Sequence, residues 1–150
     1  MRVFRFMSNS EFEMYKTGKV LINNNNHREM GFKSDSIGFC FFDESEIDIK
    51  QAIHFLSGIV SFDICAVFET DKDNLKQGYG IYKKQCKATG NLARDLVIAL
   101  MNEDTIKRTE YSTKTYSKEN FKLIKFSKDI WKQYTILEKQ KDLKWEECNV

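Results

Sequence analysis

The chain has 150 residues, of which 41% are hydrophobic and 31% are charged, proportions typical of one folded domain with a packed interior. Its 24 basic and 22 acidic side chains leave a formal net charge of +2, so a nucleic-acid partner is permitted but not implied. No apolar run approaches the roughly 18 residues of a membrane span, and the N-terminus turns polar too early for a secretory signal.

Residues 3–6 alternate apolar and basic side chains, which predicts a strand. Ser8 and Glu11 have the spacing of a capping box and predict the start of a helix that Gly18 ends. A short strand over 20–22 is expected before a run of four asparagines, which is interpreted as a loop.

The middle of the chain is predicted to hold an extended segment, a helix and a strand. Residues 31–42 are aromatic and extended in character. Four apolar residues then recur at helical spacing on one face: Ile49, Ala52, Ile53 and Leu56. The segment 60–69 alternates and predicts a half-buried strand, with one apolar face made of Phe62, Ile64, Ala66 and Phe68.

A further strand is expected over 79–82. Apolar residues between 92 and 100 suit a helix capped by Asn91, although the run Leu-Val-Ile-Ala-Leu also fits a buried strand. Residues 105–115 and the alternating segment 121–126 are predicted to pair as a β-hairpin.

A closing helix is predicted from Lys128, with Ile130, Tyr134 and Leu137 on one face and Trp145 near its end. Helices come early and late, strands dominate the middle, and strand and helix do not alternate regularly. The pattern therefore indicates one α+β domain over residues 1–150.

The cysteines and histidines give no sign of a metal site or a disulfide framework. The four cysteines lie far apart, without a Cys-x-x-Cys pair: Cys40, Cys65, Cys86 and Cys148. This spacing predicts reduced thiols in a cytoplasmic protein. Neither His27 nor His54 has a second ligand nearby in sequence, so no metal is expected. The glycine motifs of Rossmann and phosphate-loop nucleotide sites are absent from the sequence.

Three short segments stand out for their order. Arg5 lies in the aromatic strand Val-Phe-Arg-Phe, which a helix follows. Ser34 and Ser36, spaced by one residue, follow Phe32, and Glu110 lies on a late strand. In this order the segments resemble the Arg-Ser-Glu class of mono-ADP-ribosyltransferases, and the short chain is similar to its small toxin-like and phage-type members.

The resemblance implies a split β-sheet core with flanking helices that line one NAD cleft. It implies NAD-dependent transfer of ADP-ribose, a glycosyl transfer, to a macromolecular acceptor that is a protein or a nucleic acid. NAD would be the substrate, and neither a metal nor a membrane would take part. Breaking the bond between nicotinamide and ribose develops oxocarbenium-like charge, which a carboxylate stabilises.

The resemblance also gives individual residues roles. Glu110 would be the catalytic carboxylate and Arg5 would bind the pyrophosphate or the adjacent ribose. Ser34 would bind the ribose and orient Glu110, and Ser36 would hold the strand end. An aromatic side chain would stack on nicotinamide, and three are candidates: Phe39, Tyr79 and Tyr82.

Arg108 departs from the family pattern. Members that modify arginine usually carry Glu or Gln two residues before the catalytic Glu, and here that position is Arg108. The resemblance therefore implies an acceptor other than arginine. Glu103 and Asp104 lie just upstream and are alternatives to Glu110.

Each motif residue also has a purely structural interpretation. Arg5 fits a solvated strand position, and Ser34 and Ser36 fit a turn beside Asp35. Glu110 fits a surface carboxylate paired with a basic neighbour on its strand, of which there are three: Lys107, Arg108 and Lys114.

Two functional alternatives remain open. The first is a binding domain of the same fold without transferase activity. The second is an RNA- or protein-interaction domain, for which the basic cluster 83–87 and the lysine-rich C-terminal quarter are candidates, although such charges are usually a solvated face. Consumption of NAD would separate the enzyme from both alternatives.

Overall fold

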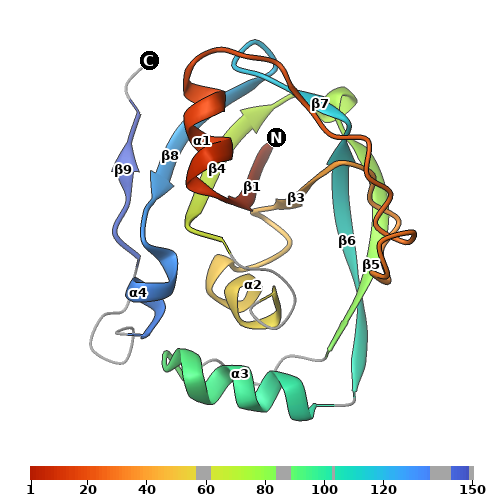
Figure 1. The fold of residues 1–150 in the computed structure, drawn as a ribbon, viewed down its shortest axis with the longest axis vertical. Coiled ribbons are helices and arrows are strands. Elements are labelled where there is room, and N and C mark those ends of the chain that lie inside the picture. The colour runs from red at the N-terminus through yellow and green to blue at the C-terminus, as the bar shows by residue number, and fades with distance from the viewer. Residues whose placement is uncertain (57–61, 84–88, 103, 136–142, 149–150) are drawn as a thin grey trace.

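The computed structural model describes residues 1–56, 62–83, 89–102, 104–135 and 143–148, and within them the fold is α+β. An antiparallel seven-stranded sheet has the order β5-β6-β3-β1-β4-β8-β9, with β8 and β9 on one side and β5 and β6 on the other (Figure 1). Its strands are β1 (Arg2–Met7), β3 (Phe39–Asp43), β4 (Ile64–Thr70), β5 (Lys76–Lys83), β6 (Thr105–Thr113), β8 (Phe121–Ser127) and β9 (Glu146–Glu147).

The remaining elements lie around this sheet. β2 (Leu21–Ile22) and β7 (Thr115–Tyr116) pair with each other as a small second sheet. The helices are α1 (Asn9–Lys16), α2 (Ile49–Leu56), α3 (Leu92–Met101) and α4 (Ile130–Thr135), with a 3-10 turn η1 (Lys72–Asn74). None of the helices in the described residues has the length and apolar character needed to cross a membrane.

The main sheet divides at β3. β1 pairs with β4 along its whole length, from Arg2 to Met7, but it pairs with β3 through Val3 and Phe4. The beginning of β3, Phe39 to Phe41, pairs instead with β6. The second half of β1 and the first half of β3 therefore separate, and the candidate site lies at this split.

Strand alternation sends apolar side chains to cores on both faces of the sheet. One core packs under α2 and α4 and receives Phe4, Phe6, Cys65 and Val67 from the central strands. The other packs under α1 and receives Val3, Met7, Ala66 and Phe68. β4 is buried on both faces except at Glu69, so the prediction of a half-buried strand is wrong. A strand in the centre of the sheet with a core on each side has no solvated face.

The predicted helix starts are confirmed. The Ser8 side chain accepts a hydrogen bond from the Glu11 backbone N–H, as the capping box requires, and Gly18 follows α1 with a φ of 85°. Asn91 caps α3 in the same way through the Arg94 N–H, so the Leu-Val-Ile-Ala-Leu run is a helix.

The predicted β-hairpin is wrong. β6 pairs with β3 and β5, whereas β8 pairs with β4 and β9 on the other side of the sheet. Phe121 and Leu123 of β8 are buried in the core that contains Phe68 of β4. Alternation predicts a strand but does not identify its partner, because long-range burial decides the pairing.

Two predicted elements have different boundaries in the structure: the extended segment and the closing helix. Of the extended segment 31–42, residues 39–42 belong to β3, while Ser34 forms an isolated bridge with Gly80. The closing helix is α4, described over Ile130–Thr135, so it begins two residues after the predicted Lys128. Trp145 lies just before β9 rather than in a helix, and the predicted position Leu137 is outside the described residues.

Candidate functional site

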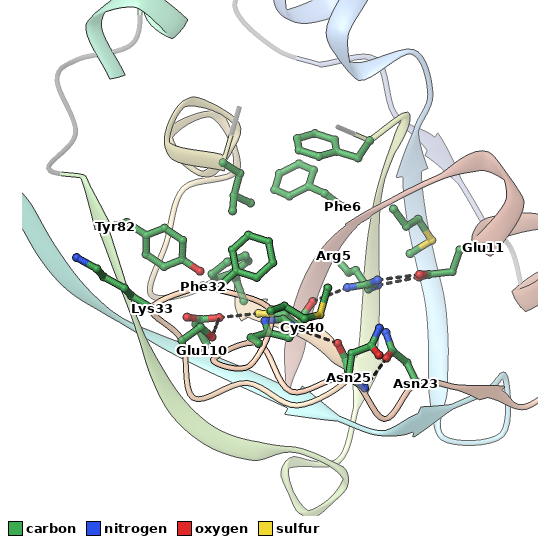
Figure 2. Close-up of a pocket in the computed structure, with 18 of the residues that line it drawn as sticks. Arg5, Phe6, Glu11, Asn23, Asn25, Phe32, Lys33, Cys40, Tyr82 and Glu110 are labelled. Atoms are coloured by element: carbon green, nitrogen blue, oxygen red, sulfur yellow. Dashed lines mark hydrogen bonds and ion pairs between the residues drawn. The ribbon is translucent and has the colours of Figure 1, made fainter. Parts of the chain in front are cut away.

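A cavity of about 360 Å³ opens at the split in the sheet (Figure 2). This volume lies within the usual range of small-molecule pockets. Its lining comes from β1, α1 with its cap, residues within the 23–38 segment, β3, the end of α2, the residue Phe62 before β4, β5 and β6. Arg5, Ser34 and Glu110, which are far apart in sequence, all line it. One wall is apolar and includes Phe6, Phe42, Leu56, Phe62 and Ile81.

Glu110 is buried at the base of this cavity, with 1% of its surface exposed. Three side chains donate hydrogen bonds to one of its carboxylate oxygens, Oε2. They are the Cys40 thiol at 2.9 Å, the Ser36 hydroxyl at 3.0 Å and the Ser34 hydroxyl at 3.2 Å. The interpretation of Glu110 as a surface carboxylate is therefore wrong. The two serines are buried and keep a turn contact beside Asp35, because the Ser36 backbone N–H donates to the Ser34 hydroxyl at 3.1 Å.

The other carboxylate oxygen, Oε1, is buried and has no hydrogen-bond partner. It lies directly over Gly80 of β5, where a β-carbon would stand 1.6 Å from it. Gly80 forms an isolated bridge with Ser34 and is opposite Arg108 in the β5–β6 ladder. Glycine at this position therefore gives the carboxylate the space to cross β5 and reach Ser34.

Arg5 is tied to α1. Its Nε and Nη2 atoms form a two-pronged ion pair with the carboxylate of Glu11, each at 2.7 Å, and its Nη1 donates to the Cys40 carbonyl at 3.1 Å. The Tyr116 hydroxyl also donates to Glu11, at 2.6 Å. Arg5 and Glu11 side chains are 16% exposed, so the interpretation of Arg5 as a solvated strand residue is wrong. Burial alone would lower the pKa of Arg5, but the hydrogen bond and charge of Glu11 outweigh it and raise the pKa.

The three aromatic candidates lie in different places. Tyr82 lines the cavity, and Figure 2 shows its ring beside Glu110. Phe39 is buried in the core under α1, where the Arg5 guanidinium lies 5.1 Å from the centre of its ring. Tyr79 is 41% exposed outside the cavity, and Lys107 Nζ is 4.1 Å from the centre of its ring. Of the three, the structure brings Tyr82 together with Arg5, Ser34 and Glu110.

Cys40 and Tyr82 are neutral, protonated groups rather than nucleophiles at neutral pH. Burial, together with the charge of Glu110, raises the pKa of the Cys40 thiol well above its ordinary value. Burial, together with the charge of Glu110, likewise raises the pKa of the Tyr82 hydroxyl. A protonated thiol is a poor nucleophile, so the cavity does not favour cysteine chemistry.

Of the two upstream alternatives, the one that the structure describes does not line this cavity. Asp104 is exposed just before β6, and Glu103 is outside the described residues. Arg108 shares a strand face with Glu110, two residues away, and its buried Nε has no hydrogen-bond partner. In the described residues, no group of three or more His, Cys, Asp or Glu side chains is arranged to hold a metal ion. Cys40, Cys65 and Cys148 are free thiols, and Cys86 is outside the described residues.

The sequence reasoning missed Gly80, Cys40 and the lining role of His27. Gly80 had a signal, because a glycine inside a strand often marks close approach by another group. No sequence signal pointed to Cys40 or His27. The contact of Cys40 with Glu110 and the contact of His27 with Gly38 both depend on the folded structure around the 23–38 segment. Comparison of the chain with protein-family models, curated proteins and solved structures found no match.

Proposed function

We propose that the chain is an NAD-dependent mono-ADP-ribosyltransferase that modifies a macromolecular acceptor, with Glu110 as the catalytic carboxylate. The observation that carries the proposal is the asymmetry of Glu110. Three donors hold Oε2, while Oε1 is buried at a cavity without a partner. A buried acceptor of this kind is suited to a hydroxyl of a bound ribose.

The arrangement supports the chemistry of this reaction. The bond between ribose C1′ and the nicotinamide nitrogen breaks with its electron pair going to the nitrogen, and positive charge develops on the ribose. A carboxylate that is already oriented stabilises this charge without reorganising. Ser34, Ser36 and Cys40 supply that orientation through Oε2. The apolar wall with Phe6, Phe62 and Tyr82 suits an aromatic base or nicotinamide ring.

Arg5 contributes in two ways. Its ion pair with Glu11 fixes the edge of β1 at the split, and its Nη1 bond to the Cys40 carbonyl joins that edge to β3. The terminal nitrogens of a guanidinium each carry a second N–H, so Arg5 retains donors for a phosphate or ribose oxygen. The exposed Lys33 at the rim adds a positive charge for the same group.

The test is Glu110→Gln, which keeps the shape of the side chain but removes its charge. We expect nicotinamide release to fall by at least about a hundredfold, with NAD affinity little changed, because the charge acts mainly in the transition state. Glu46→Gln is the matched control, since Glu46 is exposed and pairs with Tyr111 outside the cavity. Equal activity of the wild type and Glu110→Gln would refute the catalytic role.

One observation favours a second candidate, a nucleotide-binding domain of the same fold without transferase activity. The Arg5 guanidinium is already paired with Glu11, which leaves fewer donors for a pyrophosphate. Calorimetric titration with NAD, together with a nicotinamide-release assay in cell lysate, separates the two. Binding without nicotinamide release would favour the second candidate.

A further inference from the structure

His27 lies in the wall of the same cavity and is held at both ends. Its backbone N–H donates to the Ser36 carbonyl at 3.2 Å, and its ring Nε2 lies 3.0 Å from the Gly38 carbonyl. Phe32 contacts the ring with 5.9 Å between ring centres. Ser36 and Cys40, which flank Gly38 in sequence, both donate to Glu110. The ring is thus anchored to the short segment that holds the carboxylate.

The anchor fixes which ring nitrogen can accept a proton. A carbonyl oxygen is an acceptor only, so Nε2 must carry the hydrogen in this bond. In a neutral imidazole the other nitrogen, Nδ1, then carries a lone pair. This is the arrangement in which a histidine acts as a general base.

The other titratable or charged groups that line the cavity are not free to take a proton. They are Arg5, Glu11, Lys33, Cys40, Tyr82 and Glu110. Glu11 is bound by Arg5 and by the Tyr116 hydroxyl, and Cys40 and Tyr82 are already protonated. Glu110 has one oxygen held by three donors and the other assigned to the ribose. The Arg and Lys side chains are cations.

Resting on the proposed function, we propose that His27 is the general base of the transfer, and that the acceptor attacks through a protic group such as a hydroxyl. As the C1′–nitrogen bond breaks, a lone pair of the acceptor oxygen forms the new bond to C1′, and its O–H proton moves to Nδ1 of His27. The imidazolium then releases this proton to solvent. An anionic nucleophile has no proton to lose and would not need His27.

The experiment compares two nucleophiles in His27→Gln. The glutamine amide can still donate to the Gly38 carbonyl, but it has no basic nitrogen. Nicotinamide release from NAD is measured in buffer, where water is the nucleophile, and with added sodium azide, whose anion needs no base. We expect hydrolysis to fall by about a hundredfold or more and azide to restore nicotinamide release, with ADP-ribosyl azide as the product.

If His27→Gln loses hydrolysis and the azide reaction equally, the proposal is overturned and His27 is a structural residue. If hydrolysis in His27→Gln is unchanged, the proposal is also overturned. If the wild type releases no nicotinamide under either condition while Glu110→Gln behaves identically, the proposed function itself has failed.

Discussion

Adding one methyl group at Gly80 tests whether the position of the Glu110 carboxylate matters. An alanine β-carbon would stand 1.6 Å from Oε1, 2.7 Å from Cδ of Glu110 and 2.8 Å from the Tyr82 ring, whereas real β-carbons essentially never approach other atoms within 3.0 Å. The carboxylate must therefore move by about 1.4 Å, the difference between 1.6 and 3.0 Å. Displacement of a catalytic group by about 1 Å can cost about a hundredfold in rate.

We therefore expect Gly80→Ala to lower nicotinamide release about a hundredfold while the protein remains folded. Steric overpacking should also lower the free energy of unfolding, by about 1–3 kcal/mol. Gly78→Ala is the matched control because it changes the same strand, and the nearest atoms to its β-carbon belong to Asp35, at 3.1 Å or more. Full activity in Gly80→Ala would show that Glu110 does not act from the position described here.

Two further predictions concern stability. Arg5→Ala leaves the partly buried Glu11 with the Tyr116 hydroxyl as a remaining hydrogen-bond partner. We therefore expect denaturant unfolding to show a loss of about 3 kcal/mol, the lower end for a broken buried pair, and the apolar pair Arg5→Met with Glu11→Leu to recover most of it. A loss that the pair does not recover would contradict this. Asp95 of α3 is fully buried, and although burial alone would raise its pKa, hydrogen bonds from Tyr134 and Thr89 lower it. Its stabilisation is therefore complete above the unfolded pKa of about 3.9 and is lost as pH falls through the lower folded value. Asp95→Asn should lower the free energy of unfolding at neutral pH by about 1.5–3 kcal/mol. The difference in free energy of unfolding between wild type and Asp95→Asn should shrink as the pH is lowered. A difference that stays constant down to about pH 2 would contradict the lowered pKa of Asp95.

The local elements were predictable from the sequence because their signals are local. The Ser8 cap, the helix over residues 49–56 and the Asn91 cap each follow from spacing within one or two turns. The pairing of the strands was not predictable, as the incorrect hairpin between β6 and β8 shows. Both strands alternate in the same way, and the buried aromatic residues of the folded core decide which neighbour each one has.

The order of the motifs in the sequence predicted which residues meet at the cavity. Arg5, Ser34, Ser36 and Glu110 were all named from their motifs, and the structure places Arg5, Ser34 and Glu110 at one cavity with Ser36 bonded to Glu110. The partner of Arg5 was not predictable, because Glu11 lies on a helix whose orientation toward β1 depends on packing. The aromatic candidates could not be separated, since whether a ring on β3 or β5 faces the cavity depends on twist and register.

The environment of Glu110 differs from that of another buried carboxylate, Asp95. Desolvation of a buried polar atom without a partner costs about 1–3 kcal/mol, and more when the atom is charged. A carboxylate buried for stability would be expected to use both oxygens, as Asp95 does with Thr89 and Tyr134. At Glu110 three donors converge on Oε2 while Oε1 lies over a glycine at the edge of a cavity. Burial of Oε1 without a partner therefore costs desolvation free energy, which a hydrogen bond from a ligand hydroxyl would offset. Buried groups left in such an unfavourable state are typical of functional positions.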